Sequence, residues 1–174
     1  AASAKAARAL VPLIALQKEI LLLTGSGALG EDVAKEASFE TEIVYQCDRE
    51  KTRAEDTIAL AKALASRNVD LILFAGGDGT ARDLVKVKDL KIPVIGIPAG
   101  VKVHSPVFAL HPEKAGNLAL RFLSGSRKSL RETEVLDISE EAYRKGEVVT
   151  TLFGVLLTPD DPRSLHNNKA PSPR

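Results

Sequence analysis

The residues best suited to chemistry form one short segment, Gly76-Gly77-Asp78-Gly79-Thr80, which follows a run of apolar residues. Three glycines in four positions permit positive φ and let backbone N–H groups approach a ligand without interference from Cβ atoms. Because N–H groups at a helix start favour phosphate, this turn is typical of an anion-binding site. Asp78 needs a separate role in such a turn. Its carboxylate can hold Mg²⁺ or take a proton from an attacking hydroxyl.

Further candidates lie close to this turn in the sequence or in the predicted fold. Arg82 can meet a phosphate or can be a solvated helix residue, and Asp83 is a weaker candidate for a metal ligand, since an acidic residue near a helix start is favourable by itself. Gly25-Ser26-Gly27 is either a weak phosphate loop or a plain turn. Four more candidates follow a later apolar run: Gly100, Lys102, His104 and Ser105. Of these, the lysine suits a phosphate, and the histidine suits a ribose or phosphate unless it is structural.

The apolar pattern places the glycine turn between a strand and a helix. It predicts strands over 20–24, 42–46, 69–75 and 92–97, and helices over 1–17, 29–37, 52–67, 80–87 and 112–123. Thr52 and Glu55 fit a capping box at the start of the third helix. This alternation predicts an α/β fold with a mainly parallel, Rossmann-like sheet and helices on both faces. In such a sheet ligands bind beyond the carboxyl ends of the strands, which is where the glycine turn falls.

After Gly125 the pattern changes to that of a β-rich unit. Alternating polar and apolar residues predict a half-exposed antiparallel strand over 131–138, and a longer strand is expected over 148–157. The final stretch, 158–174, contains four prolines and predicts a loop or frayed tail. We therefore expect one α/β domain over 1–125 and the beginning of a β-rich second domain over 126–174.

Composition narrows the class of protein. A chain of 174 residues with 44% apolar residues and a net charge of +1 suits one globular domain, or one domain with part of a second. No apolar run reaches the ~18 residues of a membrane-spanning helix, and the charge balance gives no basis for binding nucleic acid or anionic lipid. The single cysteine, Cys47, excludes an internal disulfide framework and a zinc site of several thiolates. The absence of methionine leads us to expect a longer polypeptide.

Two segments resemble a known family. Residues 74–83, F-A-G-G-D-G-T-A-R-D, resemble the motif shared by NAD kinases, diacylglycerol and sphingosine kinases, and phosphofructokinases. Residues 92–109, I-P-V-I-G-I-P-A-G-V-K-V-H-S-P-V-F-A, and the following A-L-H-P-E-K-A-G-N-L-A-L-R-F-L resemble the ATP-NAD kinase-like branch, also described as polyphosphate/ATP-NAD kinases. Lipid kinases usually show a P-x-G-T-x-N-D-type pattern at this place, which this chain lacks. The resemblance extends over about residues 20–157.

The resemblance implies phosphoryl transfer from ATP or polyphosphate to the 2′-hydroxyl of the adenosine ribose of NAD, giving NADP, with Mg²⁺ or another divalent cation. It implies that Asp78 is the general base and ribose contact, and that Gly76, Gly77, Gly79 and Thr80 cradle the nucleotide and its phosphates. A cytoplasmic homo-oligomer is also implied. The chain lacks the family's initial glycine-rich Asn-Pro loop and the glycine/threonine-rich turn of its β-rich domain.

Two other functions stay open at this point. One is a kinase of the same superfamily with a lipid or a small alcohol as acceptor. The other is a nucleotide-binding domain that binds without reacting, although binding alone does not call for an anion at the position of Asp78.

Overall fold

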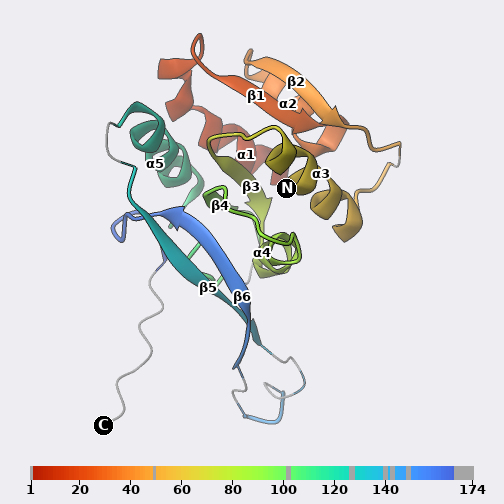
Figure 1. Ribbon diagram of the computed structural model, residues 1–174, viewed down its shortest axis with the longest axis vertical. Coiled ribbons are helices and arrows are strands. Elements are labelled where there is room, and N and C mark those ends of the chain that lie inside the picture. Colours follow the sequence, from red (N-terminus) through yellow and green to blue (C-terminus); the bar gives the residue numbers. More distant parts are fainter. Residues whose placement is uncertain are drawn as a thin grey trace.

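A computed structural model of the chain describes residues 2–48, 50–100, 103–125, 128–138, 141, 144–147 and 150–166. Helices and strands alternate along the chain up to residue 124 (Figure 1). Strand β1 (Leu21–Gly25) pairs in parallel with β2 (Glu40–Tyr45), and β3 (Ile72–Gly76) pairs in parallel with β4 (Val94–Pro98). The parallel strands and their flanking helices confirm the predicted α/β fold class.

Five α-helices and two short 3₁₀ helices surround these strands within the described residues. The α-helices are α1 (Ala2–Leu10), α2 (Glu31–Glu36), α3 (Ala54–Ser66), α4 (Asp78–Val85) and α5 (Pro112–Ser124), and the 3₁₀ helices are η1 (Pro12–Leu16) and η2 (Gly27–Leu29). None of the described helices combines the length and the apolar character needed to cross a membrane.

The β3–β4 pair separates two clusters of buried apolar side chains. Phe74 and Val94 belong to one cluster, together with residues of α3, α4 and two later strands, β5 (Leu130–Ile138) and β6 (Thr150–Pro159). Ile95 and Ile97 belong to the other cluster, together with residues of α1 and α5. Successive side chains of a strand point to opposite faces of its sheet, so the apolar runs of β3 and β4 supply both clusters. Helices therefore cover both faces of this parallel pair, as expected.

The first predicted helix, over 1–17, is shorter than expected. α1 ends at Leu10, and the 3₁₀ helix η1 follows with Pro12 at its start. Proline has no N–H to donate and its ring crowds the preceding turn, so it cannot continue an α-helix. Close packing also fixes this bend, because a Cβ atom on Gly116 of α5 would lie 2.0 Å from the carbonyl oxygen of Ala9 and 2.9 Å from the ring of Pro12.

The capping box expected at Thr52 and Glu55 is wrong by one residue. The carboxylate of Asp56 accepts the backbone N–H of Arg53 at 2.8 Å, so these two residues form the box. Asp56 is 1% exposed and also accepts the hydroxyl of Tyr45 at 2.8 Å, whereas Glu55 is exposed. Packing against β2 therefore selects Asp56 as the capping carboxylate.

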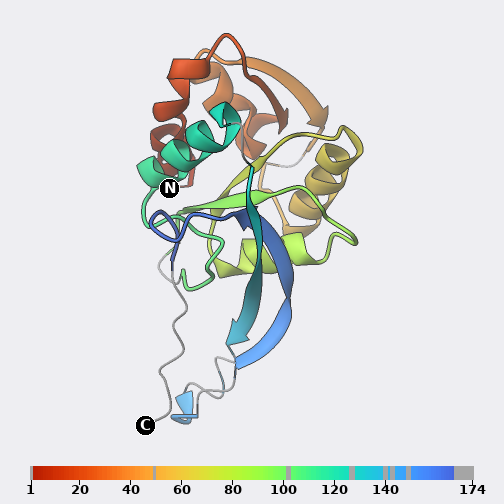
Figure 2. The same cartoon turned by 60° about the vertical axis from the view of Figure 1, so that its left-hand side comes forward.

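Strands β5 (Leu130–Ile138) and β6 (Thr150–Pro159) form the antiparallel pair expected after residue 125. In β5, Thr133 and Val135 are buried while the two glutamates beside them are exposed, as the alternation predicts. The predicted start of the second strand, at 148, lies outside the described residues. This hairpin packs against α4 and projects from the α/β part of the chain (Figure 2).

The expectation of a loop or frayed tail from residue 158 is wrong for residues 158 and 159, which belong to β6, whereas residues 160–166 form a loop that is anchored to the core. β6 continues to Pro159, and Leu165 is 1% exposed within the cluster that contains α1 and α5. The backbone N–H of Leu110 donates to the carbonyl of Ser164 at 3.0 Å, and the N–H of His166 donates to the carbonyl of Phe108 at 2.9 Å. Backbone hydrogen bonds and one buried leucine thus anchor this segment to the rest of the chain. The proline content of the sequence gave no indication of these contacts. Residues 167–174 lie outside the described part of the chain.

Candidate functional site

The glycine turn joins β3 directly to α4. Gly77 is the cap residue of the helix in extended conformation, with φ −123° and ψ −165°, and its carbonyl accepts the N–H of Thr80 at 3.0 Å. None of the glycines at 76, 77 and 79 has a positive φ, so that predicted reason for glycine is wrong, while the approach of a ligand to their N–H groups stays a prediction.

Close packing, rather than backbone conformation, explains the glycine at position 76. A Cβ atom on Gly76 would lie 2.3 Å from Oγ1 of Thr80, because the threonine side chain folds back over the end of β3. A Cβ atom on Gly100 would lie 3.5 Å from Cα of Gly77, so the turns that follow β3 and β4 come together. The N–H of Ala99 also donates to the carbonyl of Gly76 at 3.0 Å. The carboxyl ends of β3 and β4 therefore form one site, as expected for an open parallel sheet.

Asp78 is the first residue of α4, and its carboxylate spans these two strand ends. The backbone N–H of His104 donates to both carboxylate oxygens at 3.1 Å, and the N–H of Ser105 donates to Oδ1 at 3.0 Å. Both donors belong to the segment that follows β4. Asp78 is partly buried, and its position in the first turn of a helix is favourable for a negative charge. The carboxylate is thus held in one orientation beside the glycine turn.

The hydrophobic core fixes the segment that supplies these two donors. The N–H of Gly96 in β4 donates to the carbonyl of Val107, and the N–H of Ala109 donates to the carbonyl of Gly96, both at 2.9 Å. The ring of Phe108 lies directly against Gly96, where a Cβ atom would come within 2.4 Å of it. Phe108 also makes an edge-to-face contact with Phe74 of β3, with ring centroids 5.3 Å apart. One aromatic contact therefore connects both strands that lead into the site.

The other predicted site residues differ in which of their atoms lie near Asp78 or the glycine turn. The hydroxyl of Ser105 is buried and has no hydrogen-bond partner among the described residues, while His104 is exposed and reaches Asp78 through its backbone, not its ring. A Cβ atom on Gly79 would lie 3.8 Å from Nη2 of Arg82. The Arg82 side chain therefore extends back toward the glycine turn. Lys102 lies outside the described residues.

A divalent cation fits this site only if bound phosphates supply some of its ligands. Among the described residues, no group of three or more His, Cys, Asp or Glu side chains gathers as a metal site. Asp83 pairs with Lys86, with Nζ 3.7 Å from Oδ1. Mg²⁺ commonly uses one or two carboxylates together with substrate phosphates and water. Asp78 alone can supply one such carboxylate.

The second glycine turn, Gly25-Ser26-Gly27, has the features of a plain turn. Gly27 donates its N–H to the carboxylate of Glu31 at 3.0 Å, and the Ser26 hydroxyl accepts the N–H of Cys47 at 2.8 Å. The Gly27 N–H, followed by the ammonium of Lys35, holds the pKa of Glu31 below its usual value. Groups of the protein itself therefore occupy the donors that a phosphate would need.

The comparisons with known proteins place this site in a family. The family model for the ATP-NAD kinase N-terminal domain matches residues 3–126. The chain belongs to the ATP-NAD kinase family. Every site residue named above lies inside the matched range.

The comparisons with solved structures and with curated proteins give a weaker match than the family model, or none. A solved structure similar to this ATP-NAD kinase domain is that of a candidate diacylglycerol kinase from Bacillus anthracis str. Sterne, with 20% identity and a TM-score of 0.42. The match covers 68% of this chain and 42% of that one, so the chain spans less than half of the similar structure. No curated protein matches the sequence.

Two functional groups were missed by sequence reasoning. The backbone N–H groups of His104 and Ser105, rather than their side chains, contact Asp78. No residue type indicates which backbone N–H group will point at a distant carboxylate, so no signal in the sequence could have identified them.

Proposed function

We propose that this domain takes part in the phosphorylation of NAD by ATP or polyphosphate at the 2′-hydroxyl of the adenosine ribose, which yields NADP. The observation that carries the proposal is the Asp78 carboxylate, held by two backbone N–H groups beside the glycine turn at the carboxyl end of β3. The match to the ATP-NAD kinase N-terminal domain supports it.

Asp78 is the proposed general base. A carboxylate offers about four lone-pair positions, and Oδ1 receives two N–H donors while Oδ2 receives one among the described residues. Oδ2 is therefore the oxygen with room for a ribose hydroxyl. It takes the hydroxyl proton while the ribose oxygen bonds to the terminal phosphorus, and the bond from that phosphorus to the leaving phosphate breaks.

The turn around Asp78 is the proposed phosphate-binding element. The start of α4 presents backbone N–H groups, and the glycines at 77 and 79 leave room for a phosphate to approach them. The guanidinium of Arg82, which extends back over the turn, supplies positive charge near the same place. When bound with the phosphates, Mg²⁺ offsets their negative charge as the phosphoryl group moves.

The experiment that tests this function uses the full-length protein with NAD, Mg²⁺ and either ATP or polyphosphate, and measures NADP. NADP formed with either donor supports the proposal and identifies the donor. Folded protein that yields no NADP with either donor refutes it. Phosphorylation of a diacylglycerol or of glycerol in the same assay would instead assign a lipid or small-alcohol acceptor. The proposed cytoplasmic location and homo-oligomeric state need separate measurements.

A further inference from the structure

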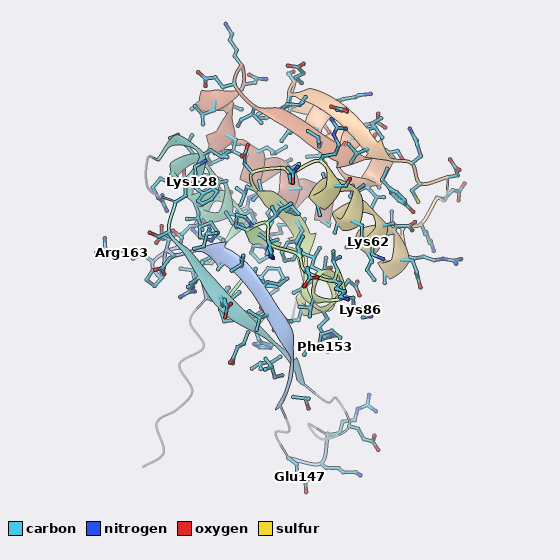
Figure 3. The ribbon with its side chains drawn as sticks, in the orientation of Figure 1. Lys62, Lys86, Lys128, Glu147, Phe153 and Arg163 are labelled. Carbon is cyan, nitrogen blue, oxygen red and sulfur yellow. The ribbon has the colours of Figure 1, made fainter. Side chains whose placement is uncertain are left out.

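A second polar site lies away from Asp78, on the other side of the β3–β4 pair. A cavity of about 410 Å³ is lined by Lys114 and Arg121 of α5 and by Asp161, Arg163 and Ser164, which follow β6. α5 packs in the cluster opposite to the one that contains α4. Figure 1 shows the two helices apart, and Figure 3 shows Arg163 on the opposite side of the molecule from Lys62 and Lys86.

The lining of this cavity carries excess positive charge. Arg121 pairs with Asp161, whereas Lys114 and Arg163 pair with no carboxylate among the described residues. The acidic neighbour Glu113 is already bound to the guanidinium of Arg8, 2.8 Å from Nη2. Two uncompensated cations around one cavity favour an anionic ligand.

Arg121 is held in place before any ligand arrives. Its Nη2 donates to Asp161 Oδ2 and to the hydroxyl of Ser164, both at 2.8 Å, and Ser164 is 4% exposed. A guanidinium has five N–H donors in a fixed plane, so one occupied nitrogen leaves others for a ligand. A pre-positioned arginine loses little freedom on binding and suits the planar, paired contacts of phosphate oxygens.

The cations around this cavity come from two segments of the chain. Lys114 and Arg121 are seven residues apart on one face of α5, which separates their Cα atoms by about 10 Å along the helix axis. Arg163 approaches the same cavity from the segment after β6. We propose that this cavity binds an oligophosphate chain, supplied by inorganic polyphosphate or by a nucleotide. A chain of phosphates offers charged oxygens along its length to cations that come from two segments of the chain. The proposal is independent of the chemistry assigned to Asp78.

The test uses the full-length protein and calorimetric titration with inorganic tripolyphosphate and, separately, with ATP. The variant Lys114→Gln/Arg163→Gln removes the two unpaired cations. The control Lys62→Gln/Lys88→Gln removes two exposed lysines that pair with no carboxylate among the described residues, so both variants have the same net charge. The glycine turn is proposed to bind the same ligands, so the comparison concerns a second binding event in each titration. We expect the first variant to lose this second event or to show it at least about tenfold more weakly, and the control to keep it within about twofold of the original protein.

The outcomes separate the possibilities. A selective loss for tripolyphosphate alone identifies free polyphosphate as the ligand, and a loss for ATP as well identifies a phosphate chain shared with nucleotides. Equal affinities of the two variants for both ligands overturn the proposal, because binding then occurs elsewhere or follows net charge alone. Thermal unfolding without ligand checks that each variant is folded. If the double variant unfolds, the same comparison is made between Lys114→Gln and Lys114→Arg, which keeps the charge. We then expect only Lys114→Arg to retain binding.

Discussion

Replacing Asp78 separates a proposed catalytic role of one side chain from the structural role that its hydrogen bonds show. Its carboxylate is the proposed proton acceptor, and it also binds the N–H groups of His104 and Ser105. Asparagine keeps one oxygen that can accept both N–H groups but cannot take up a proton. Alanine removes both functions. The two variants should therefore lose activity alike and differ in stability.

The magnitude follows from the two N–H donors at 3.0–3.1 Å. A hydrogen bond to a charged group contributes about 1.5–3 kcal/mol, but water replaces part of that at a partly exposed site. We expect Asp78→Ala to lower the free energy of unfolding by about 2 kcal/mol and Asp78→Asn by about 1 kcal/mol or less. At about 2–4 °C per kcal/mol, the alanine variant should unfold ~4–8 °C lower. Both variants should form NADP about 10²–10⁴-fold more slowly, the range lost with a general base.

Circular dichroism and NADP formation are measured on the same preparations of the full-length protein. Asp32→Asn, at an exposed aspartate in the first turn of α2, is the matched control and should change neither quantity. A near-normal rate for Asp78→Asn would exclude Asp78 as the base. An alanine variant as stable as the original protein would show that the N–H contacts contribute nothing to folding.

Three further predictions concern the frame that holds the site. Gly116→Ala should destabilise the protein by about 3 kcal/mol or more, seen by urea unfolding, because its Cβ would lie 2.0 Å from the carbonyl oxygen of Ala9. Leu165→Ala should cost about 2–5 kcal/mol in the same assay, since this side chain is 1% exposed; no loss would show that residues after β6 do not belong to the core. Arg8 lowers the pKa of Glu113 to about 2, so the pair stabilises the fold above pH 4.5 and this contribution disappears as the pH falls toward 2. Glu113→Gln should therefore show a weaker acid dependence of the unfolding temperature, and an unchanged profile would contradict the pairing.

The order of the elements could be predicted because burial on both faces leaves a strong pattern in β3 and β4. Their continuous apolar runs fill two clusters, one on each face. What failed was decided by tertiary contacts. Asp56 rather than Glu55 caps α3 because the hydroxyl of Tyr45 donates a hydrogen bond to Asp56. Leu165 is anchored by a β-bridge to Ala109, a residue 56 positions earlier in the chain. Neither contact has a local signal.

The sequence predicts a chemical role for Asp78, which stays a prediction, but it does not predict the geometry around this residue. Asp78 is conspicuous because a carboxylate is out of place in an anion-binding turn. Backbone freedom and the approach of a ligand predict glycine at position 76, but the close approach of the Thr80 side chain is what requires it. Sequence spacing does not show which atoms will come within 3 Å of each other after folding.

The position of Asp78 therefore depends on groups that are remote in the sequence. If Asp78 served only to start α4, N–H groups of the first turn of the helix would be sufficient hydrogen-bond donors to its carboxylate. Here both donors come from residues 26 and 27 positions later, and the core around Phe108 fixes the segment that carries them. Phe108 in turn touches Phe74, which leads into Asp78 along β3. Because the same contact positions the carboxylate and its donors, a shift in the core would move them together, and the hydrogen bonds between them would be preserved.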